Sequence, residues 1–85
     1  MTITVRLKFF ASLREKLGEG EALALPAGST VADARAALRA RGGAHAEALA
    51  AGRAVRSALN QKMCAESAVL ADGDELAFFP PVTGG

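Results

Sequence analysis

The sequence contains no tryptophan and no tyrosine, and it has only one cysteine and one histidine. A single cysteine, Cys64, excludes an intrachain disulfide and any zinc or iron–sulfur site built from this chain's own cysteines. Cys64 is either a reactive thiol or a packed side chain, and we favour packing because a free cysteine behaves as a small apolar residue. His45 has no acid–base partner in a local motif, so we expect a solvated histidine.

Long runs of one kind of residue are also missing. The 10 Lys and Arg nearly balance the 9 Asp and Glu, and without a basic stripe there is little support for nucleic-acid binding. No apolar run approaches the roughly 20 residues of a membrane span, and the first residues lack the pattern of a signal peptide. We therefore expect a cytoplasmic protein with no nucleic-acid and no membrane partner.

Alternating and helical patterns divide the first part of the chain into short elements. Residues 2–10 alternate as a half-buried strand. Its apolar side consists of Ile3, Val5, Leu7 and Phe9. Ser12 and Glu15 then form a capping-box pattern, which predicts a short helix that ends before Gly18. Residues 21–26 predict a second strand that is closed by a turn.

The main helix is predicted to begin at Thr30, a favourable N-cap residue, and to end at Gly42-Gly43. Its apolar stripe consists of Val31, Ala34 and Leu38. Its exposed side consists of Arg35, Arg39 and Arg41. Residues 44–52 favour a further helical turn or two, although so short a helix needs packing to be stable.

The remaining segments predict the other side of the sheet. Residues 55–64 suit a strand, a turn at Asn60 and a short return strand. The Asp-Gly-Asp sequence at 72–74 supplies the next turn, and residues 75–79 form the last strand. These carboxylates and Glu75 would also suit a cation, but Asp-Gly-Asp is more typical of a solvated turn. The order of elements predicts an α+β domain with one main helix across a mixed sheet, which is the outline of a β-grasp fold.

Two phenylalanines fall on the polar side of their strands. Phe10 follows the polar parity of the first strand, and Phe79 alternates with Phe78 on the last strand. If the first and last strands are neighbours, as in a β-grasp sheet, the two rings form one exposed apolar patch. We favour a partner surface; the alternative is a second small core beneath a loop.

The sequence ends with Pro80-Pro81-Val82-Thr83-Gly84-Gly85. Proline fixes φ and removes a hydrogen-bond donor, so we expect residues 1–79 to form the domain and residues 80–85 to project as a tail. Gly84 and Gly85 have no side chains, so a partner can enclose them in a narrow channel and reach the last carbonyl. An ionised terminal carboxylate is a poor electrophile. Conversion to a mixed anhydride with AMP, followed by sulfur delivery, would give a C-terminal thiocarboxylate.

Several segments of this sequence resemble those of the small subunits of molybdopterin synthase, which are ubiquitin-like sulfur carriers. The resemblance runs over most of the chain and is weakest in the middle helical region. It rests on Phe9-Phe10-Ala11 with Arg14-Glu15, on Asn60-Gln61, and on Asp72-Gly73-Asp74-Glu75 leading to Phe78-Phe79-Pro80-Pro81-Val82-Thr83-Gly84-Gly85.

The resemblance implies a β-grasp fold and a sulfur-carrying role in molybdenum cofactor biosynthesis. An E1-like adenylating enzyme would use ATP and magnesium to form the Gly85 acyl-adenylate, and a sulfurtransferase or cysteine desulfurase system would supply the sulfur. The Gly85 thiocarboxylate would then donate sulfur to cyclic pyranopterin monophosphate in the large subunit of molybdopterin synthase. The catalytic side chains would belong to that partner, and this chain alone would bind no metal and no cofactor.

Carried over residue by residue, the resemblance also assigns a docking surface that both partners share. Phe10, Met63 and Phe79 would form its apolar part, and Arg14 would lie at its polar rim. Met63 stands where leucine is typical, and this change conserves volume. The partner-binding set is completed by the tail residues Pro80, Pro81, Val82 and Thr83.

Three other functions are weighed against this one. A sulfur carrier for thiamine synthesis or tRNA thiolation would use the same chemistry, but the Phe-Phe-Pro-Pro-Val-Thr-Gly-Gly ending argues against it. A ubiquitin-like modifier attached to lysines through Gly85 is compatible with the sequence. A free-standing enzyme is disfavoured, because His45, Cys64 and the scattered carboxylates form no nucleophile–base–orienter arrangement.

Overall fold

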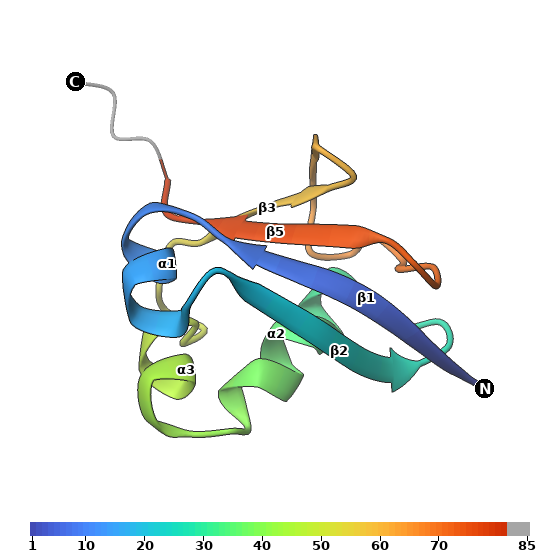
Figure 1. The fold of residues 1–85 in the computed structure, drawn as a ribbon, viewed down its shortest axis with the longest axis horizontal. Helices are drawn as coiled ribbons and strands as arrows, with labels where there is room; N and C mark the ends of the chain where they lie inside the picture. The colour runs from blue at the N-terminus through green and yellow to red at the C-terminus, as the bar shows by residue number, and fades with distance from the viewer. Residues whose placement is uncertain (82–85) are drawn as a thin grey trace.

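Residues 1–81, which the computed structural model describes, form a five-stranded mixed sheet with helices packed on one face (Figure 1). The elements are β1 (Thr2–Phe9), α1 (Ala11–Leu17), β2 (Gly20–Pro26), α2 (Val31–Arg39), α3 (Gly43–Ala48), β3 (Arg56–Leu59), β4 (Lys62–Cys64) and β5 (Glu75–Phe79). The strand order is β2-β1-β5-β3-β4. This is the predicted α+β architecture, a β-grasp. Within the described range, no helix is long and apolar enough to cross a membrane.

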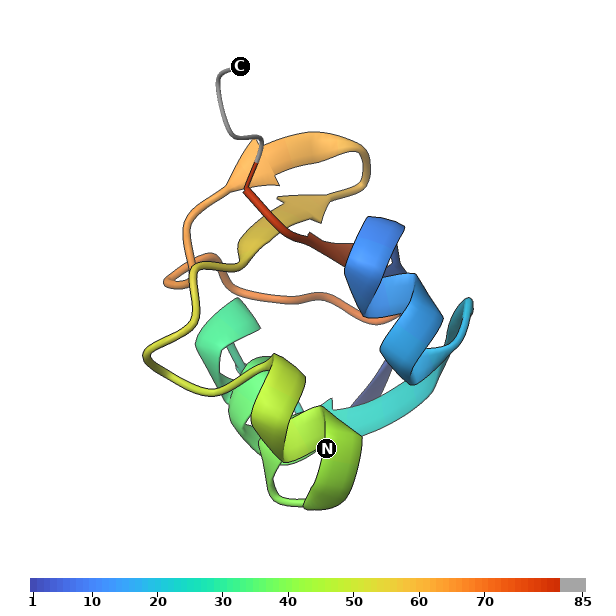
Figure 2. The ribbon, with the colours of Figure 1, turned by 90° about the vertical axis from the view of Figure 1, so that its left-hand side faces the viewer.

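The sheet is mixed because its first and last strands run in the same direction. β1 pairs antiparallel with β2 and parallel with β5, whereas β3 pairs antiparallel with both β5 and β4. β1 and β5 therefore end at the same edge of the sheet (Figure 1). Figure 2 shows that the β3–β4 hairpin lies on the opposite side of the molecule from α2 and α3.

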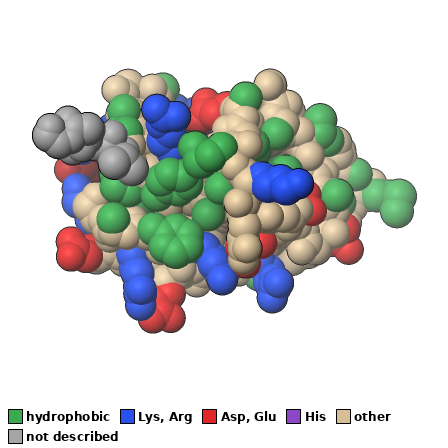
Figure 3. All heavy atoms as spheres, turned by 90° about the horizontal axis from the view of Figure 1, so that it is seen from above, with side chains coloured by type: hydrophobic (Ala, Val, Ile, Leu, Met, Phe, Trp, Pro, Cys, Tyr) green, Lys and Arg blue, Asp and Glu red, His purple; other side chains and the backbone are tan. Residues whose placement is uncertain are grey.

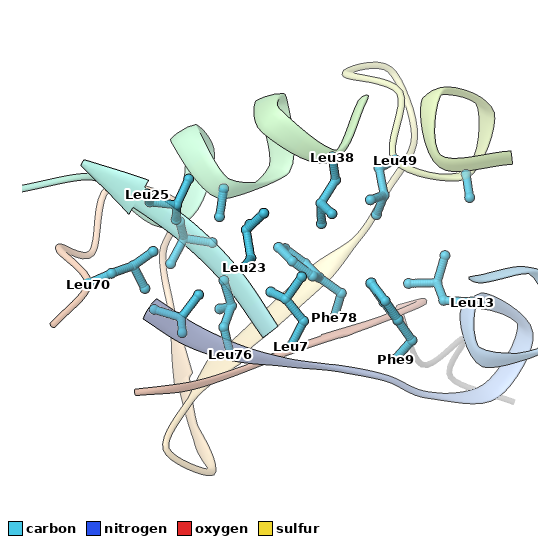
Figure 4. Close-up of a cluster of buried hydrophobic side chains, with 14 of the residues drawn as sticks. Leu7, Phe9, Leu13, Leu23, Leu25, Leu38, Leu49, Leu70, Leu76 and Phe78 are labelled. Carbon is cyan, nitrogen blue, oxygen red and sulfur yellow. The ribbon is translucent and has the colours of Figure 1, made fainter. Parts of the chain in front are cut away.

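Alternation along β1 and β5 packs one face of the sheet against the helices (Figure 4). Phe9 and Phe78 are paired across the two strands, and both are buried. Their rings stack with centroids 6.3 Å apart, within the usual range for aromatic pairs. The other buried side chains at the centre include Val5, Leu7, Leu23, Leu25, Val31, Ala34, Leu38, Leu49 and Leu76. The residues predicted for the inner face therefore form the core.

The main helix begins as predicted. The Thr30 hydroxyl accepts a hydrogen bond from the Asp33 backbone N–H (3.3 Å), and the Asp33 carboxylate accepts one from the Thr30 N–H (2.9 Å). This reciprocal pair is a capping box, which satisfies two backbone donors at the start of α2. The short helix α3 confirms the helical turns that residues 44–52 predicted.

The start of α1 differs from the prediction. Phe10 is the N-cap residue, and no side chain caps the helix, so the predicted capping box of Ser12 and Glu15 is wrong. Ala11 has a left-handed φ of 53°, which turns the chain directly after β1. The Phe10 carbonyl then accepts from the backbone N–H of Leu13. Ser12 already lies inside the first turn and is too late in the helix to cap it.

Side-chain hydrogen bonds hold two turns, one between β3 and β4 and one directly before β5. Asn60 and Gln61 have φ values of 51° and 70°, the pattern of a two-residue hairpin turn between β3 and β4. The side chain of Asn60 accepts from the Glu75 backbone N–H and donates to Asp74. In the next turn, Asp72 accepts from the backbone N–H of Thr4, and Asp74 accepts from that of Ala71. The aspartates therefore hold the predicted turn.

Arg35 contradicts the expectation of an exposed arginine on α2, because it is only 7% exposed. Its guanidinium donates to the carbonyls of Leu49 (2.8 Å), Ala50 (2.6 Å) and Arg53 (2.9 Å). It also pairs with Glu66 at 2.7 Å. The Ala50 carbonyl also accepts from the Arg53 backbone N–H (2.9 Å), and the planar fork of Arg35 binds all three carbonyls of the segment after α3.

His45 also differs from its prediction, because it is not solvated. Its side chain is 22% exposed, and Nε2 lies 3.8 Å from a carboxylate oxygen of Glu21. Arg41 hydrogen-bonds the other oxygen of Glu21. Arg41, in the turn after α2, and His45, in α3, therefore both contact Glu21 of β2.

We expect Arg35→Ala to lower the free energy of unfolding by about 3 kcal/mol, because three carbonyls and a carboxylate lose a charged donor. Urea denaturation followed by circular dichroism would measure the change. Arg53→Ala is the matched control, since its exposed side chain should contribute less than about 0.5 kcal/mol. Equal destabilisation by the two variants would show that the Arg35 network is not what holds this segment.

Candidate docking surface

The face of the sheet opposite the helices carries the candidate site (Figure 3). Strand pairing orders its side chains in rows across the strands. Phe10 follows Phe9, the partner of Phe78, and Phe79 pairs with Arg56. The next row contains Lys8, Ala77, Ala58 and Met63, and the row after it contains Arg6 and Glu75.

The three predicted apolar docking residues lie on this same face. Phe10 is 46% exposed and Met63 is 58% exposed, whereas Phe79 is half-buried. Phe10 and Phe79 face outward because the residue before each of them faces the core. Met63 joins them because the tight β3–β4 turn pairs it with Ala58. The expectation that both phenylalanines lie outside the core is confirmed.

Two alanines that sequence reasoning missed lie between these larger side chains. Ala58 and Ala77 are 9% and 7% exposed, although they occupy the outer face. They pair with each other across β3 and β5. The parity of Phe79 could have placed Ala77 here, but Ala58 required the register of β3 on β5. We call Phe10, Ala58, Met63, Ala77 and Phe79 the outer-face patch.

Charged side chains surround the outer-face patch. Arg14 lies beside Phe10, and together with Lys8 and Glu19 they line a hollow of about 220 Å³. Arg14 and Glu19 are paired at 2.8 Å. Lys8 pairs with Glu75 at 3.2 Å. Arg14 therefore stands at the edge of the patch, where the resemblance placed it.

Cys64 faces the other way from its neighbour Met63. Its side chain packs partly buried against the core. The thiol lies 3.7 Å from the Ser57 hydroxyl, which is buried on the inner face. The packed interpretation of Cys64 is confirmed.

The described residues offer a binding surface. The patch combines an apolar centre with a charged rim, the usual composition of a partner interface. Within residues 1–81, no group of three or more His, Cys, Asp or Glu is placed to hold a metal ion. Pro80 and Pro81 are half-buried beyond the end of β5. The predicted site residues Val82, Thr83, Gly84 and Gly85 lie outside the described residues, so their roles and the tail over 80–85 stay predictions.

Curated relatives match almost the whole chain. The molybdopterin synthase sulfur carrier subunit of Escherichia coli is 38% identical over 81 residues, covering 95% of this chain and 99% of the relative. The subunit of the same name from Haemophilus influenzae is 41% identical over 78 residues, covering 91% and 94%.

Solved structures share the fold. Small archaeal modifier protein 1 of Haloferax volcanii has a TM-score of 0.76 and 31% identity, covering 94% of this chain and 99% of that one. In a complex of subunits 1 and 2 of the molybdopterin-converting factor of Helicobacter pylori, the matching chain has a TM-score of 0.63 and 27% identity, covering 98% and 100%. The sequence profile of the ThiS family matches residues 7–85. The chain therefore belongs to the ThiS family.

Proposed function

We propose that this chain is the sulfur carrier subunit of a molybdopterin synthase and acts in molybdenum cofactor biosynthesis in the cytoplasm. The observation that carries the proposal is the outer-face patch, in which Phe10, Met63 and Phe79 lie on one face. Phe79 is followed directly by the segment that ends in Gly84-Gly85. Relatives named as molybdopterin synthase sulfur carrier subunits support it over nearly the full length. The complex of the two Helicobacter pylori subunits supports a large subunit as the partner.

The chemistry resides at Gly85. On an E1-like adenylating enzyme, which supplies the ATP and magnesium site, a carboxylate oxygen of Gly85 attacks the α-phosphate of ATP and releases pyrophosphate. The persulfide of a sulfurtransferase or cysteine desulfurase system then attacks the acyl carbon and displaces AMP, and a thiol reduces the resulting acyl disulfide, which releases the thiocarboxylate. The resulting thiocarboxylate is a nucleophile, and in the large subunit it transfers its sulfur to cyclic pyranopterin monophosphate.

The fold separates docking from chemistry. Phe79 is the last residue of β5, and it anchors the edge of the outer-face patch. Pro80 follows without a backbone N–H, so it cannot donate to a continued strand ladder. The apolar docking residues therefore lie in or beside the sheet, and the reacting carbonyl belongs to the segment that follows it.

The first prediction concerns Gly85. After incubation with the activating enzyme, ATP, magnesium and a sulfur donor, intact mass spectrometry should show one oxygen replaced by sulfur at the terminal residue. Deletion of Gly85 should abolish this change and leave the urea denaturation curve unaltered, because the buried core cluster is formed by residues between Ile3 and Phe78. An unmodified wild-type chain, or loss of folding on deletion, would contradict the proposal.

The second prediction concerns the patch. Phe79→Ala should weaken binding to the large subunit by about 2 kcal/mol, or roughly 30-fold in Kd, because an aromatic anchor of the interface is lost. Isothermal titration calorimetry would measure the affinity. Val69→Ala is the matched control, since Val69 is 63% exposed but lies in the loop before β5 and is not part of the patch. An equal, small effect of both substitutions would remove Phe79 from the docking surface.

A second function is favoured by one observation. The 31% identity to a small archaeal modifier protein supports attachment of Gly85 to lysines of other proteins. If the chain is a modifier, tryptic digests of cells that express it should contain lysines with a branched remnant that spans residues 63–85, because no Lys or Arg follows Lys62. These remnants should disappear when Gly85 is deleted. Remnants without any thiocarboxylate would favour the modifier over the sulfur carrier.

A further inference from the structure

Two arginines on the outer face have no acidic partner within residues 1–81. Arg56 lies opposite Phe79 in the register of β3 and β5. Arg6 lies opposite Glu75 in the register of β1 and β5, but the two side chains form no ion pair. Both side chains are exposed. In the described part of the chain, neither lies within ion-pair distance of a carboxylate, whereas Lys8 and Arg14 do. Figure 3 shows Lys and Arg side chains around the hydrophobic ones on this face.

Arg6 also stands between two hollows. The larger, about 310 Å³, is lined by Arg6, Leu7, Lys8, Glu19, Gly20, Glu21 and Ala22. It forms because Gly20 and Ala22 are the cross-strand neighbours of Lys8 and Arg6 and have almost no side chain. A Cβ on Gly20 would lie 2.0 Å from the Leu7 carbonyl oxygen, so the backbone here requires glycine and keeps the hollow open. The second hollow, about 180 Å³, is lined by Arg6, Asn60, Gln61 and Glu75.

This geometry determines what a partner must present. A guanidinium forms its strongest contacts with carboxylates, often through two parallel hydrogen bonds. Arg6 and Arg56 are two strands apart and offset by the four positions from Glu75 to Phe79. Their Cα atoms are therefore about 16 Å apart at normal strand spacing and rise. Because strand side chains stand roughly perpendicular to the sheet, we expect the two guanidiniums to contact different groups of a partner.

We propose that Arg6 and Arg56 bind two separate carboxylates of the protein that docks on the outer-face patch. The docking face of this partner is apolar at its centre and acidic at two positions of its rim. The inference rests on the proposed function for the identity of the partner, the large subunit of molybdopterin synthase. The hollows beside Arg6 give a partner side chain room to approach its guanidinium from either side.

The test is association of the full chain with the large subunit, followed by stopped-flow fluorescence at several salt concentrations. Arg6→Glu and Arg56→Glu should each lower kon about tenfold at low ionic strength, because rim charges act mainly on association. The loss should shrink as salt increases, since the Debye length falls from about 10 Å at 0.1 M to about 3 Å at 1 M. Arg53→Glu, beyond α3, makes the same change in net charge and should have a much smaller effect.

The outcomes separate this inference from the proposed function. Suppose that the wild-type chain binds, but Arg6→Glu and Arg56→Glu associate at least as fast as the wild-type chain or as Arg53→Glu. The proposed contacts with two partner carboxylates are then refuted, and the sulfur carrier role stands. If a folded wild-type chain does not bind the large subunit, the proposed function is refuted. Circular dichroism of each variant shows that it is folded before its rate is compared.

Discussion

The parallel pairing of β1 with β5 is the constraint on which the rest of the structure depends. Phe9 and Phe78 are opposite each other, and their rings stack in the core. Successive side chains of a strand point to opposite faces, so Phe10 and Phe79 face outward together. A slip of one residue in either strand would expose a core ring and bury a patch ring. The register that buries the core rings therefore also fixes which phenylalanines belong to the outer-face patch.

Local patterns were sufficient for most of the fold. Alternation gave the strands and the outward phenylalanines, and Thr30 marked the start of α2. The errors concern polar side chains whose partners are distant in the sequence. Arg35 is buried where its guanidinium reaches carbonyls that lie 14 to 18 residues further along the chain. His45 packs beside Glu21 of β2. A helical pattern separates apolar from polar residues, but only the tertiary fold shows which polar side chains find buried acceptors.

The site was predictable to the same extent. Parity found Phe10 and Phe79, and the resemblance added Met63 and Arg14. Ala58 could not be assigned to the patch from the sequence, because the face of an alanine on a short strand is known only from the register with β5. The sequence also did not show that Arg6 and Arg56 have no carboxylate partner within residues 1–81. Composition counts charges, and only the structure shows which of them are paired.

A carrier that visits two enzymes must bind each one and then leave. In the proposed function the same outer-face patch serves both, so a large and very tight interface would slow every release. A small apolar centre with rim arginines meets this requirement, because rim charges accelerate association and add little to the lifetime of the complex. In the proposed interface the alanines at 58 and 77, which are buried on the outer face, would keep the centre shallow. The exposed arginines at 6 and 56 would provide the attraction that a shallow centre lacks. The size of the patch and the charge of its rim therefore serve one property, fast exchange between partners.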